Sequence, residues 1–362
     1  MRSIIFILTV CCSLMTLAAS QGDRVRLEVT RDTWVSSSGK EQAGNNGGAT
    51  RLKTKGTQEF SLLDIDPATL RGRVIADATL HLNCASKDPQ RRVSVSTLAS
   101  DWAEGTASNY EVQKGSASFL WAKTDEKRWA FPGSDITAVC NGLGNTIWRF
   151  ADATAPDKEG WQSVAVAPDV VAARVAGISF GFVLFDDVGS EYERAGDRFT
   201  YHLFPNRFIY SREQNKARAP YFTLTLGEED HAAPEAVSGI SSDSKDLPPG
   251  QARVTWTTPK DVGPAGTLGF LARYTVAAND AKDSQPMSFD WSAATPIPQY
   301  LIPLAGLPAS KVAMHLRDLD VPPGSAIVIA IRPVDRAGNV GPVSTAGVAL
   351  SKAVPPLVLK EL

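Results

Sequence analysis

The alternation of apolar and polar residues over short runs constrains this fold more than any other feature of the sequence. In the run 221–226, YFTLTL, and in the run 24–30, RVRLEVT, every second residue is apolar. A period of two is the signature of a β-strand that buries one face. Similar runs recur along the chain between Gly, Pro, Asn and Asp residues, a spacing typical of antiparallel sandwiches. The chain is therefore predicted to be all-β.

The stretch 208–227 separates two groups of predicted strands, and a linker without strand pattern follows it at 227–234. The run 178–185 is the most apolar of the chain and predicts a strand that is buried on both faces. The loop 44–48, GNNGG, predicts a sharp turn, because glycine and asparagine tolerate positive φ. The predicted strands are 24–30, 50–55, 59–65, 74–83, 92–98, 146–150, 161–166, 178–185, 199–204 and 221–226 in the first group, and 252–256, 274–278, 326–333 and 343–350 in the second.

The second group carries two family-like signals. Trp256 lies on an early strand, and the sequence VDRAGNVG at 334–341 follows a late strand. The segment 233–351 resembles a fibronectin type III domain, in which such a tryptophan packs in the core and such a strand runs into a D-x-A-G-N turn. The insertion 284–307 is longer than that pattern expects, so the middle strands are not assigned. The resemblance implies a small Ig-like sandwich.

Length and the two groups of strands give the predicted organisation. A chain of 362 residues suggests two or three domains at about 100–200 residues each. We predict a signal peptide at 1–20, an antiparallel, jelly-roll-like β-sandwich at 21–229, a smaller fibronectin type III-like sandwich at 230–351, and a tail at 352–362.

The N-terminus has the pattern of a secretory signal. A positive charge at Arg2 precedes the apolar run 4–17, and the small residues 18–20 precede Gln21. This pattern predicts cleavage after Ser20 and a secreted or cell-surface protein. The apolar run is short for a membrane-spanning helix, so we expect no membrane insertion of the mature chain. The formal charge of −2 offers no basic field, so nucleic acid is not an expected partner.

Two cysteines remain after the predicted cleavage site, Cys84 and Cys140. In an exported protein they can form one disulfide. Sequence does not show whether their Cβ atoms face each other, so a disulfide and two buried thiols stay equal alternatives. Neither cysteine has a second ligand at close spacing, which argues against a metal site there.

The first group of strands resembles the DNRLRE-type carbohydrate-binding modules, which are related to the non-catalytic part of disaggregatase. The resemblance covers 24–227. It departs from the family where a Thr-Trp pair is often found, since Asn109-Tyr110 or Leu120-Trp121 stands there instead. The matching residues are Asp32-Thr33, Asn45-Asn46-Gly47, Leu62-Leu63-Asp64-Ile65-Asp66, Ile75-Ala-Asp-Ala-Thr-Leu80, Asp101-Trp102-Ala-Glu104, and Ser211-Arg212-Glu213 before Pro220-Tyr-Phe-Thr-Leu224.

This resemblance implies polysaccharide as the partner. Sugar binding needs flat aromatic faces with polar side chains beside them, and several such residues lie in polar surroundings. For each tryptophan the alternative is a place in the core, which is common in sandwiches. For Arg212 the favoured alternative is an internal ion pair with Glu213, Asp64 or Glu104. The candidate ligand-binding residues are Trp102, Glu104, Tyr110, Trp121, Trp129 and Arg212.

No cofactor is expected apart from calcium, which some sugar-binding sandwiches carry. Asp64, Asp66, Asp101 and Glu104 are the candidate ligands, with Asp64 and Asp66 as the main pair, because carboxylates suit this hard cation. No D-x-D-x-D-G loop fixes them, so solvated turn acids are the favoured alternative.

The sequence favours a non-catalytic role. It has no G-x-S-x-G motif and no phosphate loop, and its histidines lack ligand spacing. Carboxylates are present, but their separation in space does not follow from sequence. The main hypothesis is an exported polysaccharide-binding protein that is not an enzyme. The alternatives are a structural or adhesive surface protein, whose partners are other cell-surface proteins, and a polysaccharide lyase or hydrolase.

Overall fold

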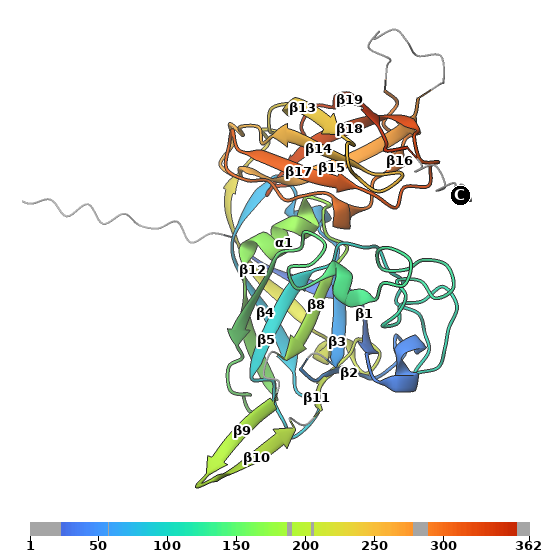
Figure 1. Cartoon of the computed structure of the whole chain (residues 1–362). Coiled ribbons are helices and arrows are strands. Elements are labelled where there is room, and N and C mark those ends of the chain that lie inside the picture. Colours follow the sequence, from blue (N-terminus) through green and yellow to red (C-terminus); the bar gives the residue numbers. More distant parts are fainter. Residues whose placement is uncertain (1–22, 57, 187–189, 204–205, 278–288, 353–362) are drawn as a thin grey trace, which may run out of the picture.

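The computed structural model shows two β-sandwiches stacked end to end, with one short helix at the joint between them (Figure 1). It describes residues 23–352 except 57, 187–189, 204–205 and 278–288. The predicted signal peptide and all but the first residue of the predicted tail lie outside the described residues. Within the described part, no helix has the length and apolar character needed to cross a membrane.

The first sandwich is built from one long strand that two sheets share. The N-terminal part of β1 pairs with β12, and from Val29 onward β1 pairs with β3. The register shifts between Val29 and Arg31, and such a bulge bends a strand. All pairings are antiparallel, and the strand order is β6-β5-β8-β3-β1-β12-β4-β7. The strands are β1 (Arg24–Ser36), β3 (Glu59–Ile65), β4 (Arg73–Asn83), β5 (Arg92–Thr97), β6 (Trp148–Asp152), β7 (Trp161–Val166), β8 (Phe182–Asp186) and β12 (Tyr221–Glu229).

The strand β8 is buried on both faces, as its apolar run predicts. Phe182 and Leu184 belong to the core cluster between the sheets, where the ring of Phe182 lies 5.0 Å from that of Phe222. Val183 and Phe185 point to the other side and belong to a second cluster. The strand is shorter than predicted, since it begins at Phe182.

The second cluster lies under residues 98–147, which we call the loop layer. This segment has no strand of its own and contains only one turn of 3-10 helix, η3 (Ile136–Val139). Its buried side chains cover the outer face of β3 and β8. Two-sided burial of β8 therefore depends on a loop rather than on a third sheet.

Smaller elements complete the first sandwich. A two-stranded hairpin, β9–β10, projects from its far end (Figure 1). The helix α1 lies at the opposite end and buries Val170, Val171 and Val175. These elements are β2 (Arg51–Thr54), which pairs with β11 (Arg207–Tyr210), β9 (Ser190–Ala195), β10 (Arg198–Leu203), α1 (Pro168–Val175), η1 (Gly39–Ala43), η2 (Ala68–Leu70) and η4 (Lys216–Arg218).

The second sandwich has a three-stranded and a four-stranded sheet, and its fold is fibronectin type III-like, as predicted. Trp256 is buried and lies edge-on to Phe270, with ring centroids 5.1 Å apart. The sheet orders are β13-β14-β17 and β16-β15-β18-β19. The elements are β13 (Ser238–Asp243), β14 (Ala252–Thr257), β15 (Thr267–Val276), β16 (Thr295–Pro296), η5 (Gln299–Leu301), β17 (Lys311–Leu316), β18 (Ala326–Asp335) and β19 (Ser344–Ala349).

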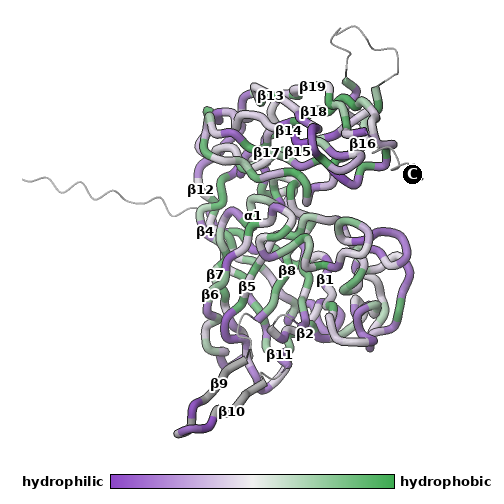
Figure 2. Tube along the Cα trace, in the orientation of Figure 1, coloured by the Kyte–Doolittle hydropathy of each residue, from purple (hydrophilic) through white to green (hydrophobic). Residues whose placement is uncertain are grey.

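The turn after β18 carries much of the joint between the sandwiches. Asp335 accepts hydrogen bonds from the backbone N–H groups of Ala337 and Asn339, which closes the predicted D-x-A-G-N turn. The Gly72 N–H donates to the carbonyl of Ala337 at 2.9 Å, and Arg336 pairs with Asp169 of α1 at 2.7 Å. Figure 2 shows hydrophobic residues running through both sandwiches and α1. The two sandwiches are therefore packed against each other rather than joined only by a linker.

The glycine loop at 44–48 is needed for a different reason from the predicted one. None of its residues has a positive φ. A Cβ on Gly47 would lie 2.2 Å from the carbonyl oxygen of Glu104, and one on Gly48 would lie 2.2 Å from that of Thr106. The glycines let this loop touch the backbone of the loop layer. The predicted turn is present, since the Ala49 N–H donates to the Asn46 carbonyl at 3.2 Å, but it forms without the expected positive φ.

Candidate functional site

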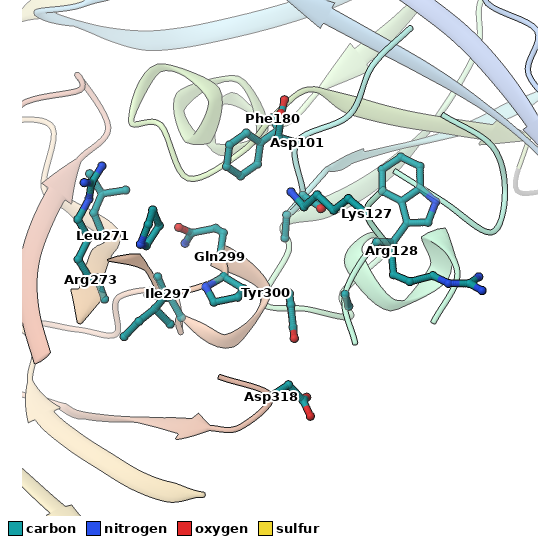
Figure 3. A pocket seen from close by; sticks show the side chains of 18 of the residues that line it. Asp101, Lys127, Arg128, Phe180, Leu271, Arg273, Ile297, Gln299, Tyr300 and Asp318 are labelled. Carbon is teal, nitrogen blue, oxygen red and sulfur yellow. The ribbon is translucent and has the colours of Figure 1, made fainter. Parts of the chain in front are cut away.

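A cleft of about 890 Å³ lies between the two sandwiches. Its size falls in the range of about 300–1,000 Å³ that is usual for ligand sites. One wall comes from the first sandwich and presents Asp101, Lys127, Arg128 and Phe180. The opposite wall presents Leu271, Arg273, Ile297, Gln299 and Tyr300 of the second sandwich (Figure 3).

Local structure positions each wall. Asp101 sits in the loop layer, where Lys123 binds its carboxylate at 3.0 Å. On the other side, the proline-flanked 3-10 turn η5 carries Gln299 and Tyr300, and its start is fixed by a hydrogen bond from the Ile297 N–H to the Ala272 carbonyl. Both walls are therefore held by backbone and ion-pair contacts rather than by free loops.

Trp291 is the tryptophan that lines the second wall. Its indole is half-buried, and its backbone carbonyl accepts a hydrogen bond from Arg273 at 2.7 Å. The guanidinium groups of Arg273 and Arg332 lie 5.3 and 5.5 Å from the indole centroid. These contacts hold the ring in place at the cleft. Phe180, also half-buried, offers a second aromatic surface on the opposite wall.

Charged groups of both signs surround these aromatic surfaces. Lys127 lines the cleft. Desolvation by the surrounding protein lowers the pKa of its ammonium group, and the nearby carboxylate of Asp101 opposes this decrease. Burial raises the pKa of the Tyr300 hydroxyl, and Asp318 adds to the rise. The cleft therefore combines aromatic faces with an amide, hydroxyl and charged groups, which suits a polar ligand with apolar faces.

Two of the predicted aromatic ligand residues, Trp102 and Trp129, do not have an accessible face. Each is only 1% exposed. The indole N–H of Trp102 donates to the carbonyl of Phe180 at 3.0 Å, and that of Trp129 donates to Ser118 at 2.9 Å. Both rings fill the space between the loop layer and the sheet. The prediction that they form a sugar platform is wrong, although Trp129 lies in the wall behind the cleft.

Trp121 and Tyr110 are half-buried and lie apart from each other. The guanidinium of Arg128 covers the ring of Trp121 at 3.6 Å from its centroid. Tyr110 lies edge-on to Trp34 at 5.2 Å and lines a smaller pocket of about 330 Å³ with Lys53 and Asn46. That pocket is a secondary candidate on the first sandwich alone.

Glu104 and Arg212 are brought together, as the ion-pair alternative expects. Arg212 Nη1 donates to Glu104 Oε1 at 2.9 Å, and the same oxygen accepts from the Asp32 N–H at 2.6 Å. Asp32 in turn accepts a hydrogen bond from the Arg212 N–H at 3.0 Å. The three residues brace β1, the loop layer and the segment after β11.

The predicted calcium ligands do not form a site. Both oxygens of Asp64 accept hydrogen bonds from Arg174, and Arg31 also donates to this carboxylate. Asp66 is exposed and accepts a hydrogen bond from the Ala68 N–H in its own turn. The carboxylate of Asp64 is therefore neutralised by two guanidiniums, and the prediction of a metal site at Asp64 and Asp66 is wrong.

Two other groups of carboxylates come together instead. Asp32, Glu104 and Glu213 offer oxygens within 4.8 Å of one another, and so do Asp230, Asp261 and Asp335. Burial raises the pKa of Asp32 to about 8, with Glu213 adding to the rise. Sequence reasoning missed both groups, because their members lie far apart in the chain.

The two cysteines are free, so the disulfide alternative is wrong. Cys84 Sγ lies 2.9 Å from the side-chain oxygen of Gln162 at the end of β4, whereas Cys140 is buried after η3 and contacts the Ile136 carbonyl. Burial raises the pKa of the Cys140 thiol to about 12. The two thiols thus sit in separate parts of the first sandwich.

The second wall of the cleft was not predicted. Its Trp291 lies in the insertion 284–307, which the fibronectin pattern left unassigned, and 278–288 lie outside the described residues. The available signal was an aromatic pair, Phe289 and Trp291, followed by Pro296 and Pro298. Proline-flanked aromatics in a long insertion fit a binding loop better than a strand.

Comparison with known proteins adds little. No family model and no curated protein matches the sequence, so the DNRLRE resemblance stays a prediction. Among solved structures, the fn3 domain of human contactin 1 is 15% identical over 36% of this chain and 88% of that chain, with a TM-score of 0.22. The chicken CNTN1 FN1–FN3 domains are 17% identical over 55% of each chain, with a TM-score of 0.24.

A third structure, the Endo-D glycoside hydrolase domain from Streptococcus pneumoniae R6, is 9% identical over 91% of this chain and 37% of that chain, with a TM-score of 0.21. Likeness at these TM-scores carries no argument about function. The fibronectin type III-like assignment rests on the strand order and on the buried Trp256.

Proposed function

We propose that this chain is an exported, non-catalytic protein that binds polysaccharide in the cleft between its two sandwiches. The observation that supports this proposal most directly is the lining of the cleft. Aromatic surfaces at Trp291 and Phe180 face a space bordered by Gln299, Lys127 and Asp318. A pyranose ring presents apolar C–H faces and an equatorial set of hydroxyls, and this lining offers a partner for each.

The border of the cleft carries charges of both signs, and its basic side chains are the groups that an acidic glycan would contact. Lys127 and Arg273 line the cleft together with four carboxylates, those of Asp101, Glu126, Asp318 and Asp320, and a guanidinium binds carboxylate and sulfate groups through paired N–H donors. Arg273 is already bound to the Trp291 carbonyl, so it is held in place before a ligand arrives. Preorganised donors reduce the entropy lost on binding.

Binding without bond cleavage is the simpler use of this lining. Among the described residues that line the cleft, none is a histidine or a cysteine. Asp101 already pairs with Lys123. If the carboxylates of the cleft cleaved the glycan, an assay for new reducing or unsaturated ends would detect the products.

The first test is a glycan-array and affinity-gel screen of the full chain, followed by substitution. Trp291→Ala removes the ring but keeps the backbone carbonyl that anchors Arg273. We expect binding about tenfold weaker, equivalent to about 1.4 kcal/mol. Phe150→Ala is the matched control, because Phe150 is an exposed aromatic residue, 49% accessible, outside the cleft.

A third variant, Lys127→Ala, tests the role of this charge. We expect it to weaken the binding of acidic glycans more than the binding of neutral ones. Equal loss in Trp291→Ala and Phe150→Ala would place the site elsewhere. A folded protein that binds no glycan and instead captures a protein would support an adhesive role.

A further inference from the structure

The first sandwich contains a group of three carboxylates that the proposed cleft does not use. Asp32 lies on β1, Glu104 in the loop layer, and Glu213 after β11. Each offers an oxygen within 4.8 Å of the other two. Like charges at this distance repel one another, so the arrangement needs a compensating charge.

Arg212 supplies only part of that compensation. It pairs with Glu104 at 2.9 Å and reaches Glu213 at 3.9 Å. When a cation displaces the proton that the raised pKa of Asp32 would otherwise retain near neutral pH, three carboxylates against one guanidinium leave two negative charges. A divalent cation matches that remainder.

Asp32 gives an independent indication of a ligand. Its side chain is in the core, with the residue only 1% exposed. One oxygen accepts the hydrogen bond from the Arg212 N–H, but Oδ1 has no hydrogen-bond partner among the described atoms. Buried polar atoms without partners are rare in proteins and call for an explanation. A metal ion held between Asp32 and its neighbours would satisfy this oxygen.

We propose that Asp32, Glu104 and Glu213 bind a calcium ion. All three ligands are carboxylates, which suit hard cations rather than zinc or copper. The exposed position of Glu213 leaves room for water ligands. Calcium tolerates such irregular, partly hydrated sites, whereas magnesium requires near-ideal octahedral geometry.

The ion would join three segments that are distant in sequence. Glu104 lies three residues after Asp101, and Asp101 lines the cleft. Calcium at this site would therefore hold the loop layer against β1. The inference does not depend on polysaccharide binding, because its readout is the stability of the protein.

The experiment compares thermal unfolding of the full chain in calcium, in magnesium and in EDTA, together with calcium titration by calorimetry. We expect calcium to raise the melting temperature by about 3 °C or more, with a smaller effect of magnesium. Asp32→Asn and Glu213→Gln should each abolish most of this response. Asparagine at position 32 keeps the shape of the side chain, and Glu213 is exposed, so at least the second variant should fold.

The second group of carboxylates provides the matched control. Asp261→Asn removes a carboxylate from the group with Asp230 and Asp335, and it should leave the calcium response unchanged. The proposal is overturned if the wild-type protein does not respond to calcium. It is also overturned if Asp32→Asn and Glu213→Gln keep the wild-type rise in melting temperature with calcium and Asp261→Asn loses it.

Discussion

Tryptophans with similar sequence surroundings differ in how deeply they are buried in the structure. Trp102 and Trp121 both lie among polar residues, yet the first is 1% exposed and the second is half-buried beneath Arg128. The difference arises because the loop layer folds over the outer face of β3 and β8, and Trp102 lies on its inner side. Arg31 stacks on the Trp102 ring and donates to its carbonyl, which adds to its fixation.

These two tryptophans should respond differently to truncation. Trp102→Ala leaves a large cavity and removes one of the two hydrogen bonds to the Phe180 carbonyl, so we expect a loss of about 3–5 kcal/mol in the free energy of unfolding. Trp121→Ala removes a partly exposed cation–π contact with Arg128 and should cost about 1 kcal/mol or less. Urea denaturation of both variants measures the difference. Equal losses would contradict the assignment of Trp102 to the core.

At the scale of elements, close backbone contacts with the loop at 44–48 attach the loop layer to the first sandwich. Asn45 is fully buried and its side chain donates to the carbonyls of Glu104 and Ala117. The same side chain accepts from the N–H groups of Gly47 and Ala107. One asparagine thus satisfies three backbone groups of the loop layer and one of its own loop, which is why a segment without strands can cover a sheet here.

Gly47→Ala tests this attachment. A Cβ at position 47 would lie 2.2 Å from the carbonyl oxygen of Glu104, so the backbones must move apart. We expect a loss of stability of about 1–3 kcal/mol. Gly347→Ala is the matched control, because a Cβ there meets nothing within 4 Å and Gly347 has no positive φ. Thermal unfolding should show little change in the control, and a similar loss in both variants would argue against the close approach.

At the scale of the whole molecule, the joint between the sandwiches places three carboxylates together. Asp230 directly follows β12 in the segment that links the two sandwiches, Asp261 follows β14, and Asp335 is the last residue of β18. Burial raises the pKa of Asp335 to about 6, with Asp261 and Asp230 adding to the rise and hydrogen bonds from Asn339 opposing it. The joint therefore contains a carboxyl group that titrates closer to neutral pH than an ordinary aspartate.

This shift predicts a pH dependence of stability. The carboxyl of Asp335 has a pKa of about 3.9 in the unfolded chain, so between about pH 4 and 6 the folded state binds the proton more tightly. Its contribution to stability is present at the acid end of this window and is lost as pH rises through 6. Free energies of unfolding in EDTA, compared between wild type and Asp335→Asn, should show the variant gaining relative stability over this range. A difference that does not change with pH would contradict the shift.

Sequence by itself determined the class of fold and most strand positions. Short apolar runs between turn residues place strands at 59–65 and 161–166 with the bounds that the structure has, because such runs match the length and composition of strands. The sequence also identified the buried core of β8 and the turn at Asp335, whose partners are local. The strand β13 was missed because its residues are small, polar and mostly exposed, whereas β17 was missed although Val312, Met314 and Leu316 alternate with more exposed residues.

Only the tertiary structure decided which polar and aromatic residues meet. Glu104 is 72 residues from Asp32, and Trp291 faces a wall built from residues more than 100 positions earlier in the chain. Spacing along a strand or turn fixes the direction of a side chain but not what is packed above it. The surroundings of Trp102 and Asp64 therefore depend on the loop layer and on the helix at the joint, which are placed by packing between distant segments.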